Sequence, residues 1–290
     1  MAVRKSLFHV QRATLKVALF FISLSLVASS SVETYKDIIE KAYNLSLQRD
    51  RLQATNVLVG ALRKESKKAA QKELIQALDQ VATVFYSDKA QQLYELALSM
   101  KASDAQMGMS KLQEASRLEP DNLSIEMAIA RQNIQNNECD AALSRLIKYK
   151  ELNRHMDDLK LVVSQAFVCV GKFEEYLDLK TSYDPRKSTR DSFWSSLEAE
   201  YLMKVGSFTK ALEVTQALQK SDADFPEGYY WQWKVESHQK VKSEKAGQKY
   251  LSLCKGLNSR LQRAYLWEPQ LCHRTVEVET FLKKNNNPEI

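Results

Sequence analysis

The apolar positions of this chain have the spacing of helices, and the pattern recurs at a nearly fixed interval. Five slots that stand 34 or 35 positions apart hold Gly108, Ala142, Tyr176, Ala211 and Ala246. After Gly108, Ala142 and Ala246, apolar residues follow at offsets of four and seven, which places them on one face of a helix. Such a period is typical of a helical solenoid, in which each unit buries its apolar face against its neighbours.

Residues that end helices stand near the joints that this period predicts. Pro120, Pro185 and Pro226 lie close to equivalent joints, and a proline ring cannot continue a helix. Gly171 and Gly206 mark turns between paired helices. The chain has only 7 glycines and 5 prolines in 290 residues, and no run of alternating β-branched residues is long enough for a sheet. The sequence therefore predicts an all-α fold with one elongated core.

Two stretches resemble the tetratricopeptide repeat (TPR) family, namely Gly206 to Ala211 and Gly108 to Asn122. The resemblance is degenerate and covers roughly residues 35–68 and 89–260. It implies a right-handed superhelical solenoid of about five to six antiparallel helix pairs. Tyr176 is too large for its slot. A generic α-helical bundle with accidental spacing is the alternative.

The chain is expected to divide into five segments. These are a secretory signal peptide (1–30), a first helix pair (31–68), an extra helix (69–88), the TPR-like repeats (89–260), and C-terminal capping helices with a tail (261–290). We expect the cap to consist of helices at 258–267 and 270–284. The residues expected to be buried between helices are Ala42, Ala54, Leu58, Ala61, Leu112, Ala115, Ala130, Leu146, Ala211, Leu212 and Ala246.

The first thirty residues have the order of a signal peptide. Four basic residues between Arg4 and Lys16 precede an apolar stretch from Val17 to Ala28, and no acidic residue occurs before Glu33. The stretch is shorter than the roughly 20 residues that span a bilayer. Cleavage is expected after Ala28, Ser29 or Ser30. No cysteine lies nearby, so a lipoprotein anchor is excluded.

Removal of this leader changes the charge. The chain has 42 basic and 36 acidic residues, a net charge of +6, and four of the basic residues belong to the leader. The remaining 38 basic and 36 acidic residues give a net charge of +2. A charge this close to zero offers little reason to expect nucleic-acid binding.

The four cysteines, an even number, suit an oxidising compartment. Cys139 is expected to begin the second helix of one unit and Cys169 to end the first helix of the next. Adjacent antiparallel helices would bring these two ends together, so a disulfide is sterically reasonable. Cys254 and Cys272 are paired only by elimination. Buried free thiols are the alternative for both pairs.

No catalytic or cofactor motif is present. Of the four histidines, His9 lies in the leader, and none belongs to an HExxH motif. Cys272-His273 is an isolated pair without further metal ligands at the usual spacing. Motifs for nucleophilic serine, phosphate or dinucleotide binding are absent. We therefore expect neither an enzyme nor a metal or other cofactor.

In the TPR family the first helices line a concave groove that receives a partner segment. By this resemblance Trp231 would be the exposed apolar anchor, while Tyr230 and Trp233 fill packing slots. Arg131 and Lys204 would set the orientation of the partner. The residues expected in the groove are Lys101, Met127, Arg131, Gln165, Glu200, Lys204, Trp231, Val235 and Gln239.

The resulting hypothesis is a non-catalytic scaffold of the bacterial cell envelope, periplasmic or secreted, that binds another envelope protein or a peptide segment. Two alternatives stay open. The chain could be the helical superstructure or accessory subunit of a peptidoglycan-acting enzyme. It could also be an organellar or cytosolic TPR adaptor with a different kind of leader.

Overall fold

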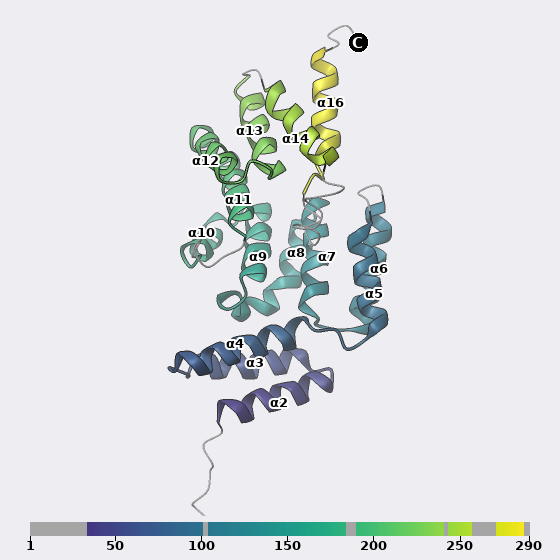
Figure 1. The fold of residues 1–290 in the computed structure, drawn as a ribbon, viewed down its shortest axis with the longest axis vertical. Coiled ribbons are helices and arrows are strands. Elements are labelled where there is room, and N and C mark those ends of the chain that lie inside the picture. The colour runs from purple at the N-terminus through teal and green to yellow at the C-terminus, as the bar shows by residue number, and fades with distance from the viewer. Residues whose placement is uncertain (1–33, 101–103, 184–189, 241–242, 257–270, 287–290) are drawn as a thin grey trace, which may run out of the picture.

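The computed structural model describes residues 34–100, 104–183, 190–240, 243–256 and 271–286, and in these ranges the fold is all-helical, without strands (Figure 1). The all-α prediction is confirmed. The expected signal peptide and its cleavage site (Ala28, Ser29, Ser30), the groove residue Lys101 and the cap segment 258–267 lie outside the described residues.

The described helices follow one another along the chain. Their bounds are α2 (Tyr35–Leu47), α3 (Arg51–Leu62), α4 (Lys68–Thr83), α5 (Asp88–Ser99), α6 (Ala105–Leu118), α7 (Leu123–Gln135), α8 (Cys139–Leu146), the 3₁₀ helix η2 (Ile147–Arg154), α9 (Asp157–Val170), α10 (Phe173–Thr181), α11 (Asp191–Lys204), α12 (Phe208–Ser221), α13 (Pro226–His238), α14 (Glu244–Gly256) and α16 (Thr275–Asn286).

Local sequence signals fix several helix ends. Thr34 and Asp37 form a capping box at the start of α2, where each side chain accepts a hydrogen bond from the other residue's backbone N–H. Pro226 stands in the first turn of α13, where its missing N–H is not needed. Gly171 and Gly206 follow α9 and α11 with φ of 80° and 76°, a left-handed conformation that favours glycine.

Consecutive helices pack in pairs, and successive pairs contact each other. The helices α5, α7, α9, α11 and α13 each pack on the helix that follows, and α7, α9, α11 and α13 also contact one another in sequence. The small residues Ala142, Ala211 and Ala246 are buried at these contacts. Tyr176 is also fully buried, and its ring lies 5.0 Å from that of Tyr201 on α11.

The predicted core is largely confirmed. Ten of the eleven residues are buried, and Leu212 is only partly buried. At the C-terminus, α16 lies beside α14 (Figure 1), and its residues Val278 and Leu282 join the cluster around Trp233 and Tyr250. The helix begins at Thr275 rather than near residue 270, because residues 271–274 form a turn.

The first three helices run across the direction of α5 to α9 (Figure 1). The predicted extra helix is α4, which packs on α2, α3 and α7. A buried ion pair fixes this junction. Arg51 at the start of α3 contacts Glu119 after α6, and the two side chains are 3% and 5% exposed. Arg51 also donates hydrogen bonds to the carbonyl oxygens of Val81 (2.7 Å) and Val84 (2.6 Å).

We expect Arg51→Ala to lower the free energy of unfolding by about 3–5 kcal/mol, because it leaves the Glu119 carboxylate buried without its partner. Arg63→Ala is the matched control, since its ion pair with Glu151 is exposed and its loss should cost less than about 1 kcal/mol. Urea denaturation of both variants measures the difference. Equal losses in the two variants would show that the junction does not depend on the buried pair.

Candidate partner-binding site

An open hollow of about 410 Å³ lies where the first helices of neighbouring pairs meet the C-terminal segment. The end of α7, the helices α9 and α11, Glu227 of α13 and the turn before α16 all contribute side chains to its lining. Three of the predicted groove residues line it, namely Gln165 on α9 and Glu200 and Lys204 on α11. The structure thus brings predicted groove residues from two helices to one hollow.

The other predicted groove residues in the described ranges do not line this hollow. Met127 and Arg131, each 7% exposed, border a separate hollow of about 710 Å³ next to α4. Val235 is fully buried in a cluster with Leu202 and Ala211, so it is a packing residue between helices. Gln239 follows α13 and is exposed.

The expectation that Trp231 is an exposed anchor is wrong, since its side chain is only 6% exposed. Its indole N–H donates a hydrogen bond to Ser196 Oγ on α11 at 3.0 Å. The Arg274 guanidinium covers its ring, with Cζ 4.7 Å from the ring centroid. Tyr230 and Trp233 are buried as predicted. The Trp231 ring lies edge to face with that of Tyr230, with ring centroids 4.9 Å apart, and Arg274 from the segment before α16 covers its face.

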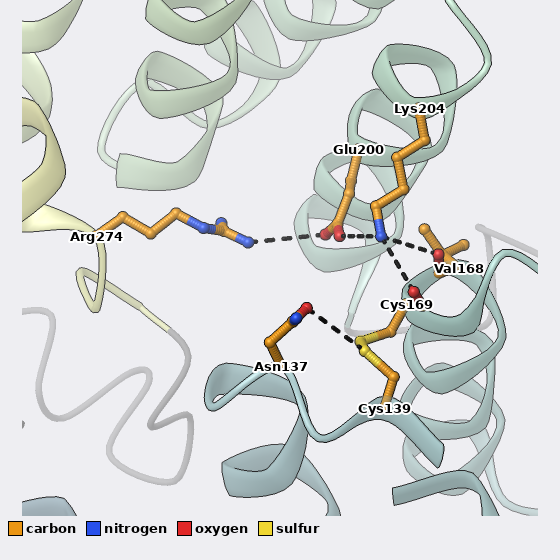
Figure 2. Close-up of a disulfide and its surroundings, with 7 residues drawn as sticks. All are labelled: Asn137, Cys139, Val168, Cys169, Glu200, Lys204 and Arg274. Carbon is orange, nitrogen blue, oxygen red and sulfur yellow. Dashed lines mark hydrogen bonds and ion pairs between the residues drawn. A yellow bond between two sulfur atoms is a disulfide. The ribbon is translucent and has the colours of Figure 1, made fainter.

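Lys204 and Glu200 form part of a polar network on one wall of the hollow (Figure 2). The Lys204 ammonium donates hydrogen bonds to the carbonyl oxygens of Val168 (3.0 Å) and Cys169 (3.4 Å) at the end of α9. A cation is favourable at this helix end, where carbonyl groups lack partners within the helix. Glu200 lies between two cations, with Lys204 Nζ at 3.6 Å and Arg274 Nη2 at 3.8 Å.

A disulfide lies at the edge of the same hollow (Figure 2). Cys139 at the start of α8 is bonded to Cys169 near the end of α9, and their Cα atoms are 5.5 Å apart. A second disulfide joins Cys254 of α14 to Cys272 before α16, with Cα atoms 5.6 Å apart. The structure therefore brings both expected cysteine pairs together.

The turn before α16 is held to the hollow by buried polar contacts. Glu227 is 4% exposed, and its carboxylate accepts hydrogen bonds from Cys272 N–H (2.8 Å) and Arg274 Nη1 (3.3 Å). Tyr250 Oη accepts the Arg274 backbone N–H at 3.2 Å. Tyr230 donates its hydroxyl hydrogen to Glu277 at 2.9 Å. The sequence contained no local signal for this cluster, because its members come from three separate segments.

Two glutamates of this cluster have opposite pKa shifts. Burial raises the pKa of Glu227 above its usual value of 4.5, and the Arg274 charge and the Cys272 N–H offset only part of this effect. Burial also acts against ionisation of Glu277, but hydrogen bonds from Lys234 and Tyr230 outweigh it and lower the pKa of this carboxyl.

The described residues contain no group of histidine, cysteine or carboxylate side chains that could hold a metal ion. Within the same ranges no helix is long and apolar enough to cross a membrane. No protein-family model matches this sequence, and no curated protein is significantly similar to it.

The two pKa shifts predict opposite dependences of stability on pH. A raised folded-state pKa means that the stability contributed by Glu227 is full below about pH 4.5 and is lost as the pH rises through the folded-state pKa. The stability contributed by Glu277 is present above about pH 4.5 and is lost as the pH falls through its lowered pKa.

Chemical denaturation between about pH 2 and about pH 7, a range of roughly two units or more on either side of the reference pKa, tests both signs. The difference in unfolding free energy between the wild type and Glu227→Gln should decrease with rising pH. The difference between the wild type and Glu277→Gln should increase. The same sign for both variants would contradict the described electrostatics of the cluster.

Proposed function

We propose that this chain is a non-catalytic scaffold that binds a segment of another protein in the hollow between α7, α9 and α11. We also propose that its helices form a right-handed, TPR-like solenoid of antiparallel pairs. The sequential contacts of α7, α9, α11 and α13 support this arrangement, because each first helix touches the next one. The buried small residues at a period of 34 or 35 support it independently.

The observation that carries the proposed function is the hollow itself. It is open, it has a volume of about 410 Å³, and its lining combines apolar side chains such as Leu197 with the charged groups of Glu200 and Lys204. Sites that receive a side chain or a short segment combine an apolar surface with a few polar groups in this way.

The proposed setting is the bacterial cell envelope or the secreted fraction. The signal-peptide pattern of residues 1–30 supports export. The two disulfides support an oxidising compartment, since thiols stay reduced in the cytosol. Another protein of that compartment is therefore the proposed partner.

Site-specific photocrosslinking tests the proposed binding surface. A photoreactive residue at position 165, which lines the hollow, is expected to give a covalent adduct with one defined envelope protein. A photoreactive residue in place of Glu213, an exposed position on α12, is the control and should not give this adduct. Gln165→Arg should weaken capture of the same protein by about 1–2 kcal/mol or more, because it fills the hollow. Equal labelling from both positions would contradict the assignment of the site.

The state of the cysteines tests the proposed compartment. Protein from the native host, alkylated without reduction, should contain no modified cysteine, because both pairs are bonded. Mass spectrometry of the intact chain measures this directly and also gives the N-terminal residue. Four alkylated cysteines on a chain that retains its leader would point to a reducing compartment instead.

A further inference from the structure

The turn that precedes α16 lines the hollow, and its Cys272 also packs against the cluster formed by α13, α14 and α16. The apolar face of α13 and α14 is covered by Val278 and Leu282 of α16. Leu271 instead packs against the cluster around Phe193, on the helices α9 and α11. Together with His273 it also lines the space next to Gln132 and Gln135 of α7. We call the segment from Leu271 to Arg274, which forms part of the wall of the hollow, the internal ligand.

Arg274 lies in a site formed by two carboxylates and two aromatic rings, groups that suit a guanidinium. Glu200 of α11 and Glu227 of α13 supply carboxylates at 3.8 Å and 3.3 Å. The rings of Tyr230 and Trp231 face its Cζ atom at 4.5 Å and 4.7 Å. A planar guanidinium can form hydrogen bonds in its plane while its faces stack on aromatic rings, which an ammonium group cannot do as well.

The burial of Glu227 shows that this site requires an occupant. A carboxylate that is only 4% exposed is costly without a cation, and the structure provides Arg274 for it. Arg274 itself keeps 23% of its side chain exposed, and Glu200 likewise keeps 23% exposed. The occupant is thus accessible from the open side of the hollow, whereas its deepest carboxylate is not.

We propose that the partner segment displaces Leu271–Arg274 and uses the same two anchors, an apolar side chain and an arginine three residues after it. This inference rests on the proposed function and specifies its ligand, a short segment of a protein with this pattern. The apolar anchor would take the position of Leu271 beside Phe193. The arginine would take the position of Arg274 between Glu200 and Glu227.

The disulfide between Cys254 and Cys272 controls this exchange. Cys272 lies in the middle of the internal ligand, and its bond to α14 holds the segment close to the hollow. A tethered ligand competes at a high effective concentration, so an external segment must bind against it. Opening this disulfide lowers the effective concentration of the internal ligand. The disulfide between Cys139 and Cys169 joins two helices at the edge of the hollow and holds no part of the ligand.

The test is the binding of a fluorescent peptide to the mature chain, measured by anisotropy. The probe is a synthetic peptide of residues 269–276 with Cys272→Ser, and the control probe also carries Arg274→Ala. The peptide should bind the Arg274→Ala protein at least about tenfold more tightly than the wild type, because the internal ligand has lost one anchor. The control probe should bind neither protein.

Two disulfide variants, which keep Arg274, provide a second and independent test in the same binding assay. The Cys254→Ser/Cys272→Ser protein should bind the peptide at least about tenfold more tightly than the wild type. The Cys139→Ser/Cys169→Ser protein should bind like the wild type. Adding Glu227→Gln to the first of these variants should abolish the gain, since the guanidinium site is lost.

The proposal is overturned if neither the Arg274→Ala nor the Cys254→Ser/Cys272→Ser protein gains affinity. It is also overturned if both disulfide variants gain equally, which would indicate general loosening of the fold. Circular dichroism monitors folding, and an Arg274→Ala protein that fails to fold leaves the decision to the disulfide variants. A crosslinked partner without peptide binding would leave the scaffold function standing and reject the internal ligand. Peptide binding without a crosslinked partner would support the internal ligand and contradict the proposed binding of an envelope protein.

Discussion

The close approach of consecutive helices is the constraint on which the rest of this structure depends. Ala142 and Ala211 are fully buried at such contacts, and larger side chains would push the helices apart. A Cβ atom on Gly247 of α14 would lie only 3.0 Å from Trp233 of α13. Because these contacts recur from joint to joint, the helices α7, α9, α11 and α13 are each placed beside the next. The faces of α9 and α11 that carry Gln165 and Glu200 are thereby brought to one hollow.

The features that a local period encodes could be predicted from the sequence. The helices, most of the core and the proximity of Cys139 to Cys169 follow from residues within one or two repeats. The burial of Trp231 could not be predicted, because the covering group is Arg274, which reaches it from beyond the last repeat. A helical pattern determines which way a side chain points from its own helix. It carries no information about a distant segment that covers that face.

Two ion pairs with a buried carboxylate mark the places where the chain departs from repeating contacts. Arg51 and Glu119 join the first three helices to α6 and α7, and Glu227 and Arg274 join the C-terminal turn to α13. Each pair brings together residues that are 47 or more positions apart in sequence. Apolar contacts would tolerate several arrangements at these joints, whereas a buried carboxylate requires its one cation in position. These pairs therefore specify how the non-repeating segments attach.

If the proposed exchange takes place, the same electrostatics would determine which external segments the hollow accepts. Displacement of Leu271–Arg274 by an apolar segment would leave Glu227 buried without a cation, and the desolvation cost would oppose binding. An arginine restores the ion pair and covers the rings of Tyr230 and Trp231 in one step. A lysine restores the charge but stacks less favourably on the two rings. The proposed selectivity for arginine would thus arise from the penalty that any other side chain incurs at this site. Such a penalty discriminates more strongly than the attraction of the arginine alone.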